Sequence, residues 1–164
     1  MEIEQIRYGL VRSVVEIGEL FRKHRKLQKL TISGVTAVTG LGNRFITEIE
    51  NGKATALVEK SLYYSKSLSL DWYILPKRSK QVSSEYPLID DFKKIGRVIR
   101  YHRKQQKANI TDTINISDLN IRLISDIENG RNVQFKNLFK ILDVYGLNLV
   151  VLPRNFYIGD YFYD

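Results

Sequence analysis

Two stretches of the chain repeat each other at a nearly constant distance. Residues 40–52 read GLGNRFITEIENG and residues 118–130 read DLNIRLISDIENG, so the offset from position 40 to position 118 is 78. Farther along, LDWYILP at 70–76 matches LNLVVLP at 147–153, where the offset from position 76 to position 153 is 77. This repetition constrains the fold more than any single motif, and it predicts two copies of one small unit.

Within the first copy, residues 40–52 predict a short helix that follows a sharp turn. Gly40 can adopt a positive φ, apolar residues follow it at helical spacing, and Gly52 can end the helix. Polar residues then face away from the core, as on a helix that enters the DNA major groove. An ordinary short helix of a bundle has the same pattern, but its recurrence 78 residues later favours a shared role. The apolar positions are Leu41, Ile46 and Ile49.

Helices are also predicted before this segment, over residues 14–29 and 32–39. Apolar residues spaced three or four apart extend this pattern upstream and predict a helical lead-in over residues 1–16. The lead-in residues are Ile3, Ile6, Leu10, Val14 and Ile17. The residues expected to be buried in the two helices are Ile17, Leu20, Phe21, Leu27, Val35 and Val38.

Each copy ends in a strand-forming run stopped by a proline, Pro76 or Pro153. A lone strand leaves its backbone groups unpaired, so we expect the two runs to pair as a two-stranded sheet, within one chain or swapped between chains. The pairing is antiparallel if a pseudo-twofold axis relates the copies. The predicted domains are 1–76 and 92–154, with a linker at 77–91 and a C-terminal tail at 155–164.

A formal charge of +8 and a sequence pI near 9.6 favour a polyanionic partner. Basic residues crowd the end of the first helix of each copy, where they either contact phosphates or complement the helix dipole. We predict phosphate contacts for Arg25, Lys26, Arg103 and Lys104. The equivalent His24 and His102 have no nearby metal-ligating partners in the sequence, so we interpret them as surface groups.

Several function classes are not expected. The chain contains no Cys, which excludes disulfides and thiolate metal sites. It has no order of residues typical of a catalytic triad and no phosphate-binding loop, so neither an enzyme nor a cofactor is expected. It lacks a run of apolar residues of membrane-spanning length and the apolar region of a signal peptide, so a cytoplasmic location is expected.

The order of helix, turn, second helix, Glu-Asn-Gly stop and final strand resembles the Xre/Cro-type helix-turn-helix family. The closer likeness is to HipB-type antitoxins, whose recognition helix and stop are similar to residues 40–53 and whose last strand before Pro is similar to 70–76 and 147–154. The likeness covers residues 14–78 and 92–154. It implies a mainly α fold of two lambda-repressor-like domains that form a pseudo-dimer in one chain.

The same resemblance implies binding of double-stranded DNA and repression of the chain's own operon, as an antitoxin that also holds a HipA-like kinase toxin. The chain would act as a monomeric pseudo-dimer or a homodimer. The residues expected to contact DNA are Ser33, Gly42, Asn43, Arg44, Thr47, Thr111, Asn120, Ile121, Arg122 and Ser125.

The sequence departs from the family pattern at a few positions. Ile32 and Ile110 replace the usual Gln at the start of the second helix, and Asp118 stands where the first copy has the turn glycine. Ile121 replaces the polar residue that Asn43 provides in the first copy. Because the two copies differ in this way, we expect the operator to be an imperfect palindrome.

Two other functions remain open at this point. The chain fits a phage or mobile-element repressor without a toxin partner equally well. It also fits a module that binds a protein partner through an aromatic tail and binds DNA only weakly. The tail residues are Phe156, Tyr157, Tyr161, Phe162 and Tyr163.

Overall fold

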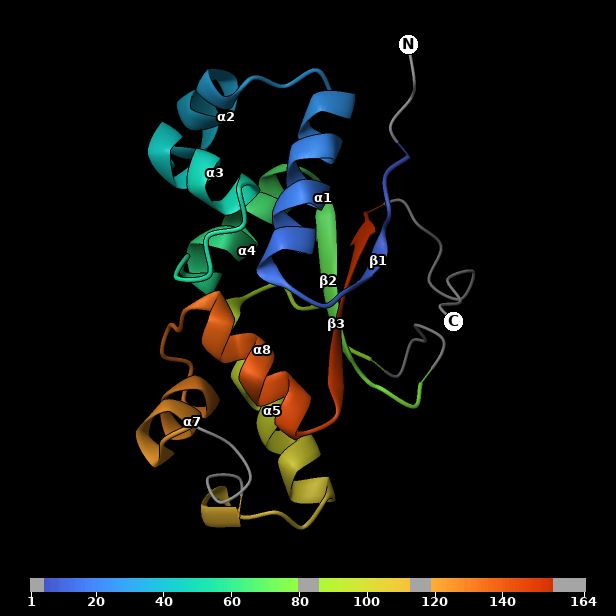
Figure 1. Cartoon of the computed structure of the whole chain (residues 1–164), viewed down its shortest axis with the longest axis vertical. Helices are drawn as coiled ribbons and strands as arrows, with labels where there is room; N and C mark the ends of the chain where they lie inside the picture. The colour runs from blue at the N-terminus through green and yellow to red at the C-terminus, as the bar shows by residue number, and fades with distance from the viewer. Residues whose placement is uncertain (1–4, 80–85, 113–118, 155–164) are drawn as a thin grey trace.

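The computed structural model describes residues 5–79, 86–112 and 119–154. The fold is mainly helical, with a small antiparallel sheet of three strands (Figure 1). The aromatic tail lies outside the described residues. The elements, in chain order, are β1 (Gly9–Val11), α1 (Val14–Leu27), α2 (Ile32–Thr39), α3 (Asn43–Glu50), α4 (Val58–Ser67), β2 (Leu70–Pro76), α5 (Phe92–Gln105), α7 (Ile121–Glu128), α8 (Phe135–Val144) and β3 (Leu147–Pro153).

The long strands β2 and β3 pair antiparallel, as predicted, and of the two predicted alternatives they pair within the chain. Tyr73 lies opposite Val150, which is its own counterpart at the offset of 77, so the register is symmetric about this pair. Leu70 opposite Pro153 is accordingly mirrored by Pro76 opposite Leu147. We call residues 5–79, which contain β2, the N-terminal half, and residues 86–112 and 119–154, which contain β3, the C-terminal half.

The predicted helical lead-in is wrong, and the sheet is not two-stranded. Gly9–Val11 forms β1, which pairs antiparallel with the outer edge of β3. Ser13 then caps α1 by accepting a hydrogen bond from the backbone N–H of Glu16, so the helix begins only at Val14. The unpaired edge of β3 needs hydrogen-bond partners, and the lead-in supplies them as a strand.

The other edge of the sheet is covered by the stretch interpreted as a linker. Ile89 forms an isolated antiparallel bridge with Trp72, and its N–H donates to the Trp72 carbonyl at 2.9 Å. Ile89 is also buried. On the opposite edge, Val11 of β1 lies opposite Leu149 of β3 in an antiparallel pair. Offsets of 78 and 77 relate these two contacts, so both edges of the β2–β3 pair are closed by equivalent residues.

The helices pack on one side of the sheet, to the left in Figure 1, and enclose a core that is continuous through both halves. Trp72 and Phe135, from different halves, lie in this core with ring centroids 5.9 Å apart. Two residues predicted to be buried are exposed instead, because each lies off the buried stripe of its helix: Leu27 at the end of α1 and Val38 on α2. No helix in the described ranges is long and apolar enough to cross a membrane.

Short segments before α4 and α8 join the halves a second time. Val58 N–H donates to the Val133 carbonyl at 2.9 Å, and Phe135 N–H donates to the Ala56 carbonyl at 3.0 Å. The side chain of Asn132 accepts a hydrogen bond from the N–H of Glu59, so a residue of one half caps a helix of the other. The two halves therefore share backbone hydrogen bonds as well as a core.

His24 is buried, not on the surface as predicted. Its Nε2 lies 2.9 Å from the Leu68 carbonyl, and its Nδ1 lies 2.6 Å from the Tyr8 hydroxyl. The Leu68 carbonyl can only accept, so a proton on Nε2 satisfies this contact and Nδ1 then accepts from Tyr8 in a neutral ring, while the side-chain amide of Gln28 also lies 2.9 Å from Nε2. Burial lowers the pKa of His24, and a hydrogen bond to Leu68 offsets part of this effect. His102, which is half-buried, also has a lowered pKa, caused by burial and then by the charge of Arg78.

We expect the free energy of unfolding to fall as the pH drops below about 6.5, the ordinary pKa of histidine. The unfolded chain binds protons at His24 and His102 more readily than the folded chain does. The stabilisation is therefore complete above that pH and is lost as the pH falls through the lower pKa values of the folded state. Urea unfolding between pH 5 and 8 measures this dependence, and His24→Gln and His102→Gln each reduce it. A slope that survives in the double variant would contradict the assignment.

Candidate nucleic-acid interface

The two short helices α3 and α7 lie on the same side of the molecule, on the left in Figure 1. Each turns an apolar stripe inward, with Ile46 and Ile49 buried on α3 and Ile124 and Ile127 buried on α7. Gly40 precedes α3 with a φ of 75°, as predicted for the turn, and its N–H donates to the carbonyl of Thr36. Asp118, its counterpart in the C-terminal half, lies outside the described residues.

The outer face of α3 carries a connected set of polar side chains. The Arg44 side chain is 89% exposed, and its Nε donates to Glu48 at 3.0 Å. The other oxygen of Glu48 accepts from Lys53 at 2.9 Å. These hydrogen bonds, first that from Lys53 and then that from Arg44, hold the pKa of Glu48 below its usual range. Thr36 of α2 donates its hydroxyl to the side-chain oxygen of Asn43 at 2.6 Å.

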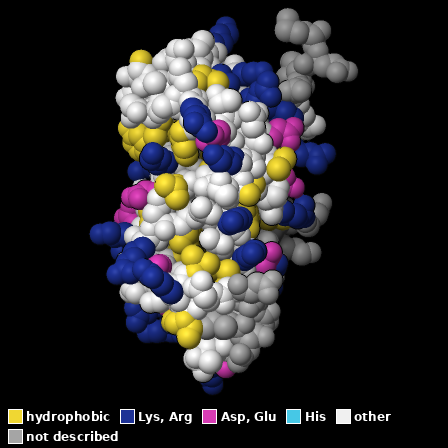
Figure 2. Space-filling view, turned by 60° about the vertical axis from the view of Figure 1, so that its left-hand side comes forward, with side chains coloured by type: hydrophobic (Ala, Val, Ile, Leu, Met, Phe, Trp, Pro, Cys, Tyr) yellow, Lys and Arg dark blue, Asp and Glu magenta, His cyan; other side chains and the backbone are white. Residues whose placement is uncertain are grey.

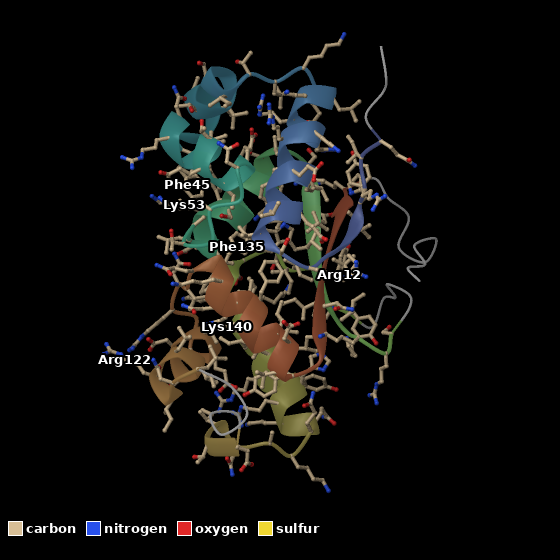
Figure 3. The ribbon with its side chains drawn as sticks, in the orientation of Figure 1. Arg12, Phe45, Lys53, Arg122, Phe135 and Lys140 are labelled. Carbon is tan, nitrogen blue, oxygen red and sulfur yellow. The ribbon has the colours of Figure 1, made fainter. Side chains whose placement is uncertain are left out.

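The outer face of α7 is arranged differently. Arg122 is 85% exposed and its Nε lies 3.9 Å from Asp126, which is beyond hydrogen-bond distance. Asp126 pairs with Arg131 instead, at 2.9 Å. Ile121 is 56% exposed at the start of the helix. In Figure 3, Arg122 extends outward from α7, on the same side of the molecule as Lys53 and Phe45.

Asn120, which we predicted to contact DNA, has a different role. Its side-chain oxygen accepts a hydrogen bond from the Leu123 N–H at 2.8 Å, so Asn120 caps α7. The NH₂ group of the Asn120 side chain takes no part in this hydrogen bond. Ser125 is half-buried, and its hydroxyl lies 3.3 Å from the Asn129 amide. These two side chains are therefore committed in part to the helix itself.

Two of the four residues that were predicted to contact phosphates form buried ion pairs instead. Arg25 donates through Nε and a terminal nitrogen to both oxygens of Glu50, at 2.7 and 3.0 Å. Arg103 makes the same bidentate pair with Glu128, at 2.6 and 3.0 Å. Their side chains are only 8% and 12% exposed, so the prediction of phosphate contacts is wrong for both arginines. Each pair joins α1 to the end of α3, or α5 to the end of α7, and so fixes how the outer helix is presented.

The pair in the N-terminal half is reinforced. The Tyr64 hydroxyl also donates to Glu50, and burial followed by this hydrogen bond raises the pKa of Tyr64. At the equivalent position, 77 residues later, the C-terminal half has Ile141. The hydrogen bonds from Arg25 to Glu50 in turn raise the pKa of Arg25.

Close helix packing accompanies these pairs. A Cβ atom on Gly18 of α1 would lie 2.3 Å from the Ile49 carbonyl oxygen, and one on Gly96 of α5 would lie 1.9 Å from the Ile127 carbonyl oxygen. Only glycine fits such an approach, so α3 and α7 are seated against α1 and α5 by the same device.

The remaining predicted contacts are accessible at the surface. Figure 2 shows this side of the molecule, where Lys and Arg side chains are scattered over the surface with hydrophobic and acidic side chains between them. The exposed members of the predicted set, apart from those described above, are Ser33, Gly42, Thr47, Thr111, Lys26 and Lys104. Sequence reasoning missed Lys53, and it missed Lys60, whose ammonium lies 5.8 Å from the centre of the Phe45 ring. Within the ranges described, no group of His, Asp and Glu could hold a metal ion.

A curated protein matches part of the chain. It is an uncharacterized HTH-type transcriptional regulator, y4mF, of Sinorhizobium fredii strain NGR234, with 37% identity over 65 residues. The matched segment is 40% of this chain and 86% of that protein. The chain belongs to the HTH-type transcriptional regulators. No family model matches it, and no solved structure does.

The difference in coverage is informative for an HTH-type regulator. The match takes up most of the relative but well under half of this chain, which leaves room here for a second unit of similar size. The recurrence of the Arg–Glu pairs and of the glycine contacts at an offset of 78 agrees with such a second unit.

Replacing Glu50 with Gln should lower the free energy of unfolding by about 3 kcal/mol, because it leaves the buried charge of Arg25 unpaired. Glu128→Gln should cost less, since the Arg103 side chain is more exposed than that of Arg25. The control is Glu48→Gln on the surface of α3, with a much smaller expected reduction, because exposed ion pairs contribute little to stability. Urea unfolding measures all three, and equal reductions for Glu48→Gln and Glu50→Gln would contradict the structural role.

Proposed function

We propose that the chain is a sequence-specific DNA-binding transcriptional repressor whose two halves form a pseudo-dimer. One observation carries the proposal: α3 and α7, one from each half, are exposed on the same side of the molecule. The β2–β3 pair that joins the two halves has a symmetric register. Helix-turn-helix dimers place two recognition helices in this way to enter successive major grooves, about 34 Å apart along the duplex. Here both helices belong to one chain, which a tandem duplication of a single-domain regulator explains.

The charge distribution supports this function. The net charge of +8 favours association with a polyanion. Lys26 and Lys104 lie in the last turn of the first helix of each half and are exposed, so they are available to phosphates. Arg44 and Arg122 project from the outer helices, where a guanidinium can pair bidentately with guanine. We assign no catalytic role to any of these residues.

Selection from a pool of random DNA duplexes tests the proposal, with the wild type compared against Arg44→Ala and Arg122→Ala. We expect an enriched imperfect palindrome, with base preference relaxed in one half-site by Arg44→Ala and in the other by Arg122→Ala. Discrimination at each contacted base should fall by about 1–3 kcal/mol. If both variants relax the same half-site, only one half of the chain reads DNA, and a role as a protein-interaction module is favoured.

The exposed lysines give a separate prediction about non-specific binding. Lys26→Ala and Lys104→Ala should weaken binding to all sequences alike and lower the salt slope by roughly one unit for each phosphate that is no longer neutralised. Lys77→Ala is a matched control, because Lys77 pairs with Asp143 at the end of β2, away from α3 and α7. Anisotropy titrations at several salt concentrations measure the slope. An unchanged slope in the first two variants would assign those lysines to solubility and to the helix dipole.

The antitoxin role is the finer part of the proposal and rests on the resemblance to HipB-type antitoxins. It requires a kinase-like toxin encoded beside this chain. Expression of the neighbouring gene should arrest growth, and co-expression of this chain should restore it and yield a complex that co-purifies. A harmless neighbour would favour instead a phage or mobile-element repressor that acts without a toxin.

A further inference from the structure

The first residue of the outer helix differs in chemistry between the halves. Asn43 begins α3 and Ile121 begins α7, and the offset of 78 makes them equivalent. Both side chains are exposed. Ile121 lies away from the buried stripe of its helix, which Ile124 and Ile127 form, so the core does not account for it. The position therefore presents an amide in one half and a branched alkyl group in the other.

Asn43 is restricted by its neighbour. Its side-chain oxygen accepts a hydrogen bond from the Thr36 hydroxyl, which uses one of the two lone pairs of that oxygen and orients the amide. A bidentate pair with adenine needs both a donor and an acceptor from the asparagine. Since one lone pair of the oxygen already accepts from Thr36, the NH₂ group of Asn43 is the part best suited to meet a base, where it can donate to an acceptor such as N7 or O6 of guanine.

The neighbouring arginines are also held differently. Glu48 is long enough to bind Arg44 through Nε, which leaves the terminal nitrogens of this guanidinium free and oriented. Asp126 is shorter by one methylene, stays 3.9 Å from Arg122 and pairs with Arg131. The guanidinium of Arg44 is thus preorganised before binding. Arg122 must be ordered on binding, and this entropic cost reduces the contribution of Arg122 to affinity.

An exposed alkyl group can recognise few features of a duplex. The edges of the bases in the major groove carry hydrogen-bonding groups, and the 5-methyl group of thymine is the one apolar feature among them. Ile121 has no group with which to donate or accept a hydrogen bond. An alkyl side chain at the start of a recognition helix therefore gains most by covering a thymine methyl and excluding water from it.

We propose that the two operator half-sites are read by different chemistry: the α3 half-site by hydrogen bonds from Arg44 and Asn43 to guanine, and the α7 half-site by contact of Ile121 with the 5-methyl group of a thymine. This inference rests on the proposed DNA-binding function and specifies what each half recognises. The asymmetry of the operator then follows from three equivalent pairs of residues: Asn43 and Ile121, Arg44 and Arg122, and Glu48 and Asp126.

The test uses the full chain and the duplex enriched by selection. Each thymine is replaced in turn by deoxyuridine, which lacks only the 5-methyl group, and the Kd is measured by fluorescence anisotropy at fixed salt. We expect one replacement, in the half-site that Arg122→Ala relaxes, to weaken binding about fourfold, corresponding to ~0.8 kcal/mol for one buried methyl-sized group. The equivalent position of the other half-site should show no such effect.

Variants assign the effect to one side chain. Ile121→Ala should bind the thymine and deoxyuridine duplexes equally, and Ile121→Asn should remove the thymine preference in selection. Leu27→Ala removes an equally exposed alkyl group from the end of α1 and should keep the fourfold difference. Ile121 is exposed, so its replacement leaves the core intact.

Two results would overturn this inference while leaving sequence-specific binding in place. In one, no thymine of the enriched site is sensitive to deoxyuridine. In the other, the sensitivity persists unchanged in Ile121→Ala, or appears equally in both half-sites. Failure to enrich any sequence is a different result, because it would overturn the proposed DNA-binding function together with this inference.

Discussion

The pairing of β2 with β3 is the interaction on which the arrangement of the whole molecule depends. Each half contributes a single long strand, and seven residue pairs join them in a register centred on Tyr73 and Val150. A lone strand could not satisfy its own backbone groups, so neither half completes its fold alone. The same pairing places α3 and α7 on one side of the molecule. Since both strands belong to one chain, the spacing of the two helices does not depend on the protein concentration.

Within each half, a buried ion pair links the first helix, α1 or α5, to the exposed helix, α3 or α7. Arg25 and Glu50 join α1 to the last residue of α3 and are nearly inaccessible to solvent. Desolvation makes such a pair an uncertain source of stability, but its geometry leaves little freedom in how the helix is seated. The glycine contact at Gly18 has the same effect, because it brings two backbones together without an intervening side chain.

The sequence predicted the helices near residues 14–29 and 32–39 and the antiparallel pairing of the two long strands, because these depend on local pattern and on the need to pair strands. It failed where tertiary partners decide. Arg25 follows Ile17 and Phe21 at steps of four, a spacing that placed it on the buried stripe, yet its charge suggested the surface. Repetition of the acid as Glu50 and Glu128 was the signal that could have revealed its partner.

The lead-in failed for a related reason. Its apolar spacing suits a helix, but Gly9 adopts a φ of 108° and Ser13 caps the next helix, which interrupts any helical run. The exposed edge of β3 then offers hydrogen bonds that a helix could not use. Sequence periodicity reports which residues are buried and says little about an edge that forms only after two distant strands have paired.

Because the two halves are covalently linked, each half can carry a substitution that the other half lacks. In a homodimer, any substitution appears twice and must suit both sides of the axis. Here Trp72 and Phe135 pack together, whereas the residues at the offset of 77, Leu149 and Val58, are smaller, so the core holds larger residues at one of these two equivalent places than at the other. All four side chains are buried, so this divergence has not opened the core to solvent. Ile121 shows the same freedom on the surface, where no packing partner in the buried stripe constrains it. Differences between the outer helices therefore depend on what those helices contact and not on the core, and under the proposed function that contact is a double-stranded DNA site of two unequal halves.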